Sequence, residues 1–346
     1  MARQLELGLD TFGDVTNEAD GTPVPYAQVL RNLVAQGVLA DRVGLDYIGV
    51  GEHHRKDFAV SAPEVVLAAI AALTERIHVG TAVTVLSSDD PIRVFQRFAT
   101  LDGISNGRAE VILGRGSFTE SFPLFGLNLE DYERLFEEKL ELFAAVRQQQ
   151  PVNWAGSTRA EVIEKSVYPI LENGLLPTWI GVGGSPESVV RTARYGFNLM
   201  LAIIGGEPAR FAPYVDLFHR ALAQFELPTP KIGVHSPGHI AETDGQAREE
   251  LWPHHSEMMS RIGKERGWGP MSRESFENEA DTGSLYVGSP ETVAQKIAST
   301  ARVLGLDRFD LKYSNGTLAH EKLISSIELF GTVVAPRVRE LLSHEV

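Results

Sequence analysis

The amino-acid sequence predicts an α/β protein built on a closed barrel of eight parallel strands, a (β/α)8 or TIM barrel. Short apolar runs alternate with amphipathic segments along the 346 residues, which is the pattern of repeated strand–helix units. Few of the apolar runs alternate between apolar and polar residues, as expected of parallel strands covered on both faces. Eight such units favour a closed barrel over an open doubly wound sheet.

The expected elements follow one another in chain order. Strands are expected at 5–9, 47–50, 77–83, 109–113, 178–182, 197–203, 232–241 and 308–313. Helices are expected at 26–43, 63–74, 91–104, 129–147, 186–195, 208–225, 246–262, 290–304 and 321–342. Several of these helices begin with a proline, whose missing N–H has no intrahelical partner at that position anyway. We expect one domain over residues 1–346, with irregular insertions at about 148–176 after the fourth helix, where a short hairpin could form, and at about 263–286 after the seventh.

Composition argues against several classes of partner. The formal net charge is −14 and the pI is near 5.2, so phosphate backbones and anionic lipid should repel the protein. The chain has no run of about 18 apolar residues, which a membrane-spanning helix needs. Cysteine is absent, which excludes a disulfide, a zinc–thiolate site and a thiol nucleophile, and fits a cytoplasmic location.

The stretch Gly49-Val50-Gly51-Glu52-His53-His54 is the first candidate for chemistry. In a barrel, functional groups gather where strands end, and this acid and two imidazoles directly follow an apolar run. Histidine exchanges protons near neutral pH. Adjacent histidines cannot both face one way, and no third ligand is obvious, so we expect no metal site; the alternative is a pair of surface or helix-capping imidazoles. The other such dipeptide, His254-His255, is expected on a solvated helix face.

A second candidate is the turn Gly183-Gly184-Ser185-Pro186-Glu187-Ser188, between a strand and a helix. Glycines allow a ligand close to the backbone, the helix N-terminus offers free N–H groups, and the serines add hydroxyls. The turn could therefore cradle a phosphate. Its spacing does not match the dinucleotide fingerprint, and no P-loop lysine follows. The alternative is an ordinary strand–helix turn with a serine N-cap.

Other strand ends supply further candidates. Arg115, flanked by glycines, suits a clamp for phosphate or carboxylate, or else an ion pair at the barrel rim. The small and β-branched residues Thr81, Ala82 and Val83 could form an apolar wall for a flat ring, or fill the core. His235 and His239 could reach the barrel mouth, but we expect them to be structural.

Together these motifs resemble those of the bacterial-luciferase-like flavin monooxygenase family, almost end to end. The resemblance is carried by the stretches at 51–54, 101–108, 114–116, 183–188 and 286–291, in that order and spacing. It implies a barrel that binds reduced FMN supplied by a separate NAD(P)H:flavin reductase and uses oxygen to oxidise a small organic substrate. It also implies a homodimer, with helices two and three at the contact.

The resemblance further assigns roles to residues. It implies that His53 handles protons during the reaction of the flavin with oxygen, with Glu52 and His54 in support. It places the flavin phosphate at Arg115 and at Gly183, Gly184, Ser185 and Ser188. It implies a non-proline cis peptide near 81–85, beside the ring, and a mobile lid at 263–286.

Three alternatives remain open at this point. The same fold could bind a deazaflavin coenzyme and transfer hydride as a dehydrogenase or reductase. It could bind flavin without catalysis. A barrel aldolase or isomerase acting on a sugar phosphate is less attractive, because Lys312 is the one lysine at an expected strand end and Schiff-base chemistry needs such a lysine.

Overall fold

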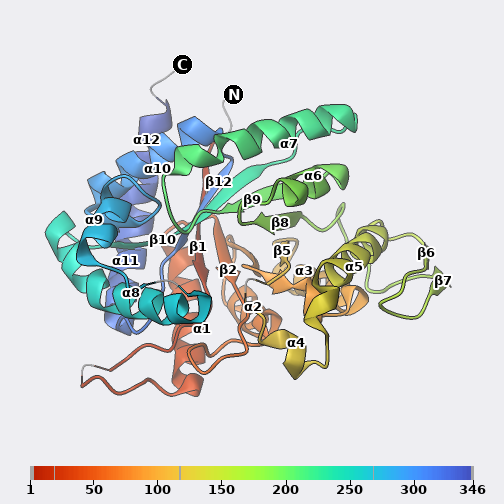
Figure 1. Ribbon diagram of the computed structural model, residues 1–346, viewed down its shortest axis with the longest axis horizontal. Helices are drawn as coiled ribbons and strands as arrows, with labels where there is room; N and C mark the ends of the chain where they lie inside the picture. The colour runs from red at the N-terminus through yellow and green to blue at the C-terminus, as the bar shows by residue number, and fades with distance from the viewer. Residues whose placement is uncertain (1–3, 19, 117, 268, 344–346) are drawn as a thin grey trace.

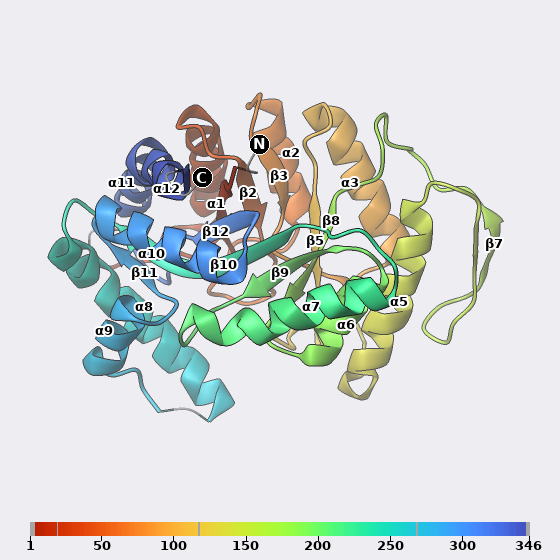
Figure 2. The same ribbon diagram turned by 90° about the horizontal axis from the view of Figure 1, so that it is seen from above.

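The computed structural model describes residues 4–18, 20–116, 118–267 and 269–343. Strands gather at the centre of the molecule and helices surround them, as two perpendicular views show (Figures 1 and 2). The strands follow the order β3-β2-β1-β12-β10-β9-β8-β5-β4, and each neighbouring pair on this path is parallel. The predicted parallel barrel is therefore confirmed.

The barrel strands lie close to their predicted positions. Their bounds are β1 (Glu6–Thr11), β2 (Tyr47–Val50), β3 (His78–Thr81), β4 (Thr84–Val85), β5 (Val111–Gly114), β8 (Thr178–Val182), β9 (Asn198–Ala202), β10 (Ile232–Ile240) and β12 (Arg308–Lys312). The sequence did not predict β11 (Tyr286–Gly288), which pairs in parallel with the far end of β10. Because β10 has nine residues, its end runs past the part that pairs with β9 and β12.

The barrel closes where one predicted strand is interrupted. The strand expected at 77–83 ends as β3 at Thr81, and β4 begins at Thr84 after a cis peptide bond between Ala82 and Val83. Val79 of β3 bridges to Ala109 and β4 pairs with β5, so both ends of the strand path meet here. The non-proline cis peptide expected near 81–85 is thus confirmed, whereas the uninterrupted strand is wrong.

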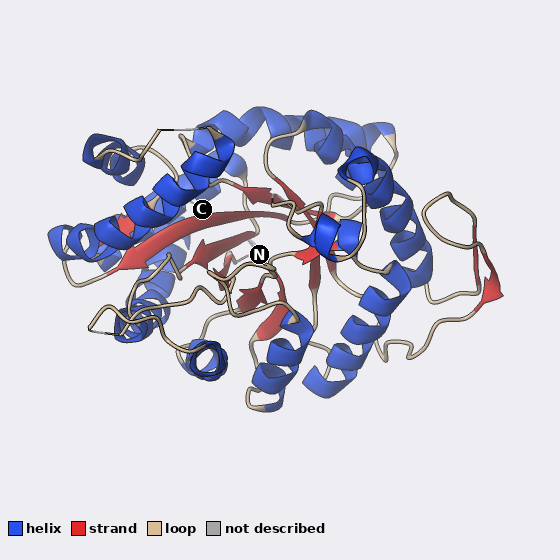
Figure 3. Ribbon diagram, turned by 60° about the horizontal axis from the view of Figure 1, so that its bottom comes forward, coloured by secondary structure: helices blue, strands red, loops and turns tan. Residues whose placement is uncertain are grey.

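The helices form the outer layer (Figure 3). Their bounds are α1 (Tyr26–Arg42), α2 (Pro63–Ala72), α3 (Pro91–Ser105), α4 (Ser121–Leu124), α5 (Tyr132–Arg147), α6 (Pro186–Arg194), α7 (Ala212–Gln224), α8 (Asp244–Arg266), α9 (Arg273–Asp281), α10 (Pro290–Leu304), α11 (His320–Leu329) and α12 (Ala335–Ser343). Proline occupies the first turn of α2, α3, α6 and α10, as predicted. The closing helix is divided into α11 and α12 by a π-helical turn, Phe330–Val334. No helix within the described ranges is both long enough and apolar enough to cross a membrane.

The two predicted insertions differ in character. The first contains an antiparallel hairpin of β6 (Val152–Trp154) and β7 (Val162–Lys165), which projects from the barrel in Figures 1 and 2. The second was expected to be irregular, and this is wrong. There α8 continues to Arg266 and α9 follows, capped by Ser272, whose hydroxyl accepts the N–H of Ser275. A serine N-cap in a polar segment is the signal that would have predicted α9.

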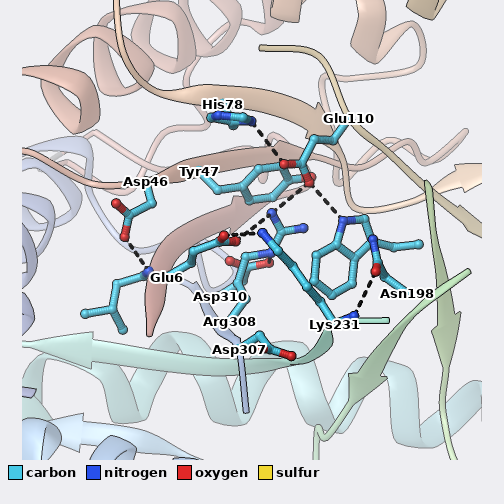
Figure 4. A network of polar contacts seen from close by, with 12 residues as sticks. Glu6, Asp46, Tyr47, His78, Glu110, Asn198, Lys231, Asp307, Arg308 and Asp310 are labelled. Atoms are coloured by element: carbon cyan, nitrogen blue, oxygen red, sulfur yellow. Dashed lines mark hydrogen bonds and ion pairs between the residues drawn. The ribbon is translucent and has the colours of Figure 1, made fainter. Parts of the chain in front are cut away.

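Charged side chains fill the amino-terminal half of the barrel (Figure 4). The guanidinium of Arg308 is fully buried between the rings of Tyr47 and Trp179, with its carbon 4.1 and 4.0 Å from their centroids. It donates to Glu110 at 2.8 Å. Burial alone would raise the pKa of Glu110, but the charge of Arg308 holds it well below its usual range. Asp310 beside them has a raised pKa because of its burial. This part of the barrel is a packed core, so a functional site is expected at the carboxyl ends of the strands.

Candidate functional site

The carboxyl ends of the barrel strands carry an aromatic enclosure around His53. The imidazole centroid lies 4.9 Å from that of Phe12, 4.6 Å from Phe58 and 5.0 Å from Phe118. The side chain of His53 is 12% exposed, and its backbone N–H donates to Val60 at 3.0 Å. The ring that follows β2 is therefore fixed in place and shielded from most of the solvent.

Glu120 orients the imidazole of His53. Nδ1 of His53 lies 3.2 Å from Oε1 of Glu120, the residue before α4. Although burial alone would raise the pKa of Glu120, the hydrogen bond with His53 lowers it. An ionised carboxylate beside Nδ1 favours the tautomer with the proton on Nδ1, which leaves Nε2 to exchange a proton with a ligand. No sequence motif pointed to Glu120, because only the fold brings the two residues together.

Glu52 has a supporting position. Its carboxylate accepts the N–H of Val85 at 2.9 Å, so it holds the backbone just after the cis peptide. Burial raises the pKa of Glu52 to about 7. His54 instead contacts Phe125 edge-on, with centroids 5.1 Å apart, and burial lowers its pKa. The expectation that adjacent histidines face different ways is confirmed.

Thr81 and Ala82 are buried, and Val83 packs against a buried cluster that includes Tyr47 and Trp179, while their part in an apolar wall for a ring stays a prediction. The hydroxyl of Thr81 is buried and lies 2.9 Å from that of Thr84. Val83 is half-buried and its side chain covers Gly114 and Gly181, where an added Cβ would lie 2.6 and 3.1 Å from its methyl groups. Because β5 and β8 carry glycine at these points, the Val83 side chain fits between the start of β4 and these two strands.

The turn before α6 has the geometry of a capped helix start. The hydroxyl of Ser185 accepts the N–H of Ser188 at 3.3 Å and donates to Glu187 at 2.8 Å. The N-cap interpretation is therefore confirmed. Gly184 has φ of 109°, a conformation that favours glycine. A Cβ at Gly183 would meet nothing within 4 Å, so the backbone there borders open space.

Two guanidinium groups lie close to this turn and share one acid. Arg115 pairs with Glu133, and its guanidinium carbon lies 5.5 Å from the ring of Tyr132. Arg191 of α6 lies 3.5 Å from the other carboxylate oxygen of Glu133. The rim ion pair considered for Arg115 is thus present, and the carboxylate of Glu133 bridges two cations. The sequence did not predict Arg191. Ser117, two residues after Arg115, lies outside the described residues.

The end of α8 is attached to the mouth. Arg55 donates to Glu265 at 2.7 Å, and Arg261 lies 3.1 Å from Asp57. The guanidinium of Arg55 also lies 4.8 Å from the centroid of Phe118, one of the rings around His53. The expected lid region, 263–286, therefore contacts the loop after β2 through Glu265. The mobility of this region stays a prediction.

Other histidines occupy positions that the sequence did not indicate. His255 was expected on a solvated face, and this is wrong: it is 4% exposed, and burial lowers its pKa to about 4. Its neighbour His254 lies 2.8 Å from the hydroxyl of Thr317. His239 is buried and bonded to Glu250 of α8, as expected of a structural residue. His235 instead lies in the barrel, with Nδ1 2.5 Å from Asp10.

A closed parallel barrel with an oriented imidazole and a cationic turn at the carboxyl ends of its strands is the arrangement of a TIM-barrel enzyme. Among the described residues, no group of three or more side chains is placed to hold a metal ion. The model of the luciferase-like monooxygenase family matches residues 11–308. The chain belongs to this family, and membership supports an oxidoreductase.

Two relatives show the extent of the sequence similarity. The chain is 29% identical to an uncharacterised protein of Sinorhizobium fredii, y4vJ, over 181 residues, so it spans about half of that relative's length (51% of each). It is 22% identical to the alkanal monooxygenase alpha chain of Photobacterium leiognathi over 345 residues, which covers 91% of this chain and 95% of the relative.

Solved structures show the same fold. The monooxygenase RslO1 of Streptomyces bottropensis superposes with a TM-score of 0.80 at 19% identity, over 96% of this chain and 99% of that one. The oxygenating constituent of 3,6-diketocamphane monooxygenase of Pseudomonas putida, in complex with FMN, has a TM-score of 0.76 at 18% identity, over 96% and 98%. A secondary alcohol dehydrogenase dependent on coenzyme F420 has a TM-score of 0.74 at 16% identity, over 97% and 99%.

Proposed function

We propose that this protein is a flavin-dependent monooxygenase that uses reduced FMN from a separate reductase, together with oxygen, to oxidise a small organic substrate. One observation carries the proposal. The mouth joins a shielded imidazole, His53 held by Glu120, to an apolar wall at Val83 and to a cationic turn at Arg115. FMN combines a flat ring with a phosphate tail. Its site therefore needs a proton-exchanging group and an apolar wall near the ring, and cations near the phosphate. Of the similar proteins above, RslO1 is a monooxygenase, and the oxygenating constituent of 3,6-diketocamphane monooxygenase is in complex with FMN.

The residues present fit a flavin phosphate. Gly183 borders open space at the start of α6, where N–H groups and the helix dipole favour an anion. Arg115 and Arg191 flank Glu133, whose carboxylate is 60% exposed and can move away when a phosphate takes its place between the guanidiniums. Ser185 caps α6 and so keeps these N–H groups in position.

The residues around His53 suit controlled proton transfer. FMN supplies the redox chemistry with oxygen when it is bound, and the protein positions the reacting groups. Nε2 of His53 can give or take a proton at the ligand, because Glu120 engages Nδ1. Phe12, Phe58 and Phe118 limit the access of water to this nitrogen. Glu52 holds the backbone of Val85 at the wall and does not itself exchange the proton.

An anaerobic titration tests this proposal. Reduced FMN, oxidised FMN and riboflavin are each added to the protein, and binding is followed by absorbance and fluorescence. We expect reduced FMN to bind more tightly than oxidised FMN, and riboflavin to bind more weakly because it lacks the phosphate. Equal affinity for the reduced and oxidised forms, or no affinity for either, would remove the two-component mechanism.

A deazaflavin coenzyme is the main alternative, because an F420-dependent dehydrogenase shares the fold. Tight binding of F420 without affinity for FMN would decide for a hydride-transferring enzyme. Retention of reductase-coupled oxygen consumption and product formation in His53→Ala would leave only a flavin-binding role for this residue. Gel filtration with light scattering tests the proposed homodimer, and we propose a cytoplasmic location for the reaction.

A further inference from the structure

A buried carboxylate and an imidazole form a second oriented pair inside the barrel. Asp10 of β1 is fully buried, and its Oδ2 lies 2.5 Å from Nδ1 of His235 on β10. The side chain of His235 is 11% exposed, whereas that of Asp10 is 0% exposed. The imidazole is therefore the end of the pair that a molecule in the mouth can reach, and Nε2 is the nitrogen that Asp10 does not engage.

The barrel backbone is shaped to hold this carboxylate. The next strand, β2, carries Gly49 opposite Asp10, and a Cβ there would lie 2.1 Å from Oδ1 of Asp10. Any larger residue at position 49 would displace the carboxylate that orients the imidazole. The pair is thus fixed by the close approach of two strands and not by a movable surface side chain.

The pair is also adjacent to the mouth residues described above. The ring of Phe12 lies 6.1 Å from that of His235, in a stacked orientation, and 4.9 Å from that of His53. One phenylalanine therefore separates two imidazoles, each bonded through Nδ1 to a carboxylate. The nearby ammonium of Lys312 is held by Asp14 at 2.9 Å, so Asp10 is left to His235.

The buried His239 does not share these properties. His239, four residues further along β10, is bonded through Nε2 to Glu250, and its side chain is 1% exposed. Lys322 of α11 also donates to Glu250, so His239 belongs to the contact between β10, α8 and α11. His235 lies in the part of β10 that pairs with β9 and β12 inside the barrel. His239 lies further along β10, in the part that pairs with β11.

We propose that Asp10 and His235 form a second acid–base pair of the site, which exchanges a proton with the substrate while His53 serves the flavin. The assignment rests on the proposed function for the identity of the flavin, but the state of the pair can be measured without it. Asp10 is the positioning residue: its carboxylate accepts the Nδ1 proton, so the lone pair on Nε2 faces the mouth. A substrate hydroxyl that loses its proton transfers it to Nε2, and Asp10 stabilises the resulting imidazolium; the reverse transfer returns it.

Nitrogen-15 NMR of the protein labelled at histidine rings tests the tautomer directly. The resonances of His235 are assigned by their loss in His235→Gln. We expect a protonated Nδ1 and a largely unprotonated Nε2 in the free protein, because Nδ1 donates to the carboxylate of Asp10, and we expect Asp10→Asn to weaken this preference, because an Asn side chain presents both a donor and an acceptor. The opposite tautomer in the wild-type protein would overturn the proposal, even if the variant failed to fold.

Carbethoxylation by diethyl pyrocarbonate, read by mass spectrometry, tests access. His219 of α7 is exposed and serves as the positive control, and the buried His239 is the negative control. We expect His235 to react in the free protein much faster than His239, because its side chain keeps 11% exposure against 1%. A His235 rate as low as that of His239 would overturn the assignment.

A flavin titration separates the failure of this inference from the failure of the proposed function. The anaerobic FMN titration is run on the wild type and on His235→Gln. If reduced FMN does not bind the wild type, the proposed function fails, while the tautomer and the reactivity of His235 still decide on the pair. If reduced FMN binds both proteins and shields His235 from diethyl pyrocarbonate in the wild type, both are supported. Binding without any shielding would show that His235 does not face the occupied mouth and would refute the pair's role.

Discussion

Glu52 should make this protein less stable at high pH, and replacing it with glutamine should remove that effect. Burial raises the pKa of Glu52 from about 4.5 in the unfolded chain to about 7 in the folded one. Between these two pH values the folded protein keeps a proton that the unfolded chain has lost, so folding stability decreases as the pH rises. Above pH 7 the decrease is complete.

The expected size follows from the two pKa values. Each pH unit between them corresponds to about 1.4 kcal/mol, so the ionisable Glu52 costs about 3 kcal/mol at pH 8 relative to pH 4.5. Glu52→Gln is neutral and similar in shape, and its amide oxygen can still accept the N–H of Val85. The variant should match the wild type near pH 4.5 and be more stable by about 3 kcal/mol at pH 8, or about 4 °C in Tm for a chain of this length.

Thermal unfolding of both proteins from pH 4.5 to 8.5 measures this difference. Glu328→Gln is the matched control, because the carboxylate of Glu328 is 51% exposed and lies 3.8 Å from its partner Arg42. The control should follow the wild type at every pH. A stability difference between Glu52→Gln and the wild type that stays constant, or that shrinks as the pH rises, would refute the assignment of the raised pKa to buried Glu52.

Three further outcomes are expected. His53→Gln should lower the rate of substrate oxidation by about 10²- to 10⁴-fold, the usual contribution of a general acid or base, whereas His54→Gln should change the rate little. Equal losses of rate in the two variants, measured in steady-state assays, would contradict the separation of their roles. Arg115→Ala should weaken binding of reduced FMN by about 10- to 100-fold, as expected for a lost charge-assisted hydrogen bond, without changing the affinity for riboflavin. An equal loss of affinity for both ligands would place the phosphate elsewhere. Arg308→Met should destabilise the fold by about 3–5 kcal/mol in urea unfolding because it leaves buried acids without their cation, while Arg42→Met, at an exposed pair, should cost less than about 1 kcal/mol.

The repetitive part of the fold was predictable from the sequence because it depends on local patterns. Apolar runs bounded by turn residues gave the barrel strands to within a few residues, and prolines in first turns gave the starts of α2, α3, α6 and α10. Apart from α9, whose local cap signal was overlooked, the predictions failed where contacts between distant segments decide the structure. The strand expected at 77–83 is divided at the cis peptide, and β11 forms because β10 offers an edge for it.

The candidate site shows the same division. Glu52, His53 and Ser185 were found because each stands next to its strand or helix end, and a serine before a proline-initiated helix is a local capping signal. Glu120 lies 67 residues from His53 and Asp10 lies 225 residues from His235, so no spacing in the sequence relates either pair. Arg191 was missed because an arginine in the last turn of a helix carries no sign of the acid that it will meet.

The sequence alone determined that this chain forms a parallel barrel and which strand ends carry an acid, imidazoles, glycines and an arginine, because periodicity and residue type act over a few neighbouring positions. Only the tertiary structure decided which nitrogen of His53 and of His235 is bonded, that burial raises the pKa of Glu52, and that His235 keeps some exposure while His239 has almost none. These properties depend on burial and on distances of about 3 Å between strands that are remote in sequence, and closure of the barrel is what sets both.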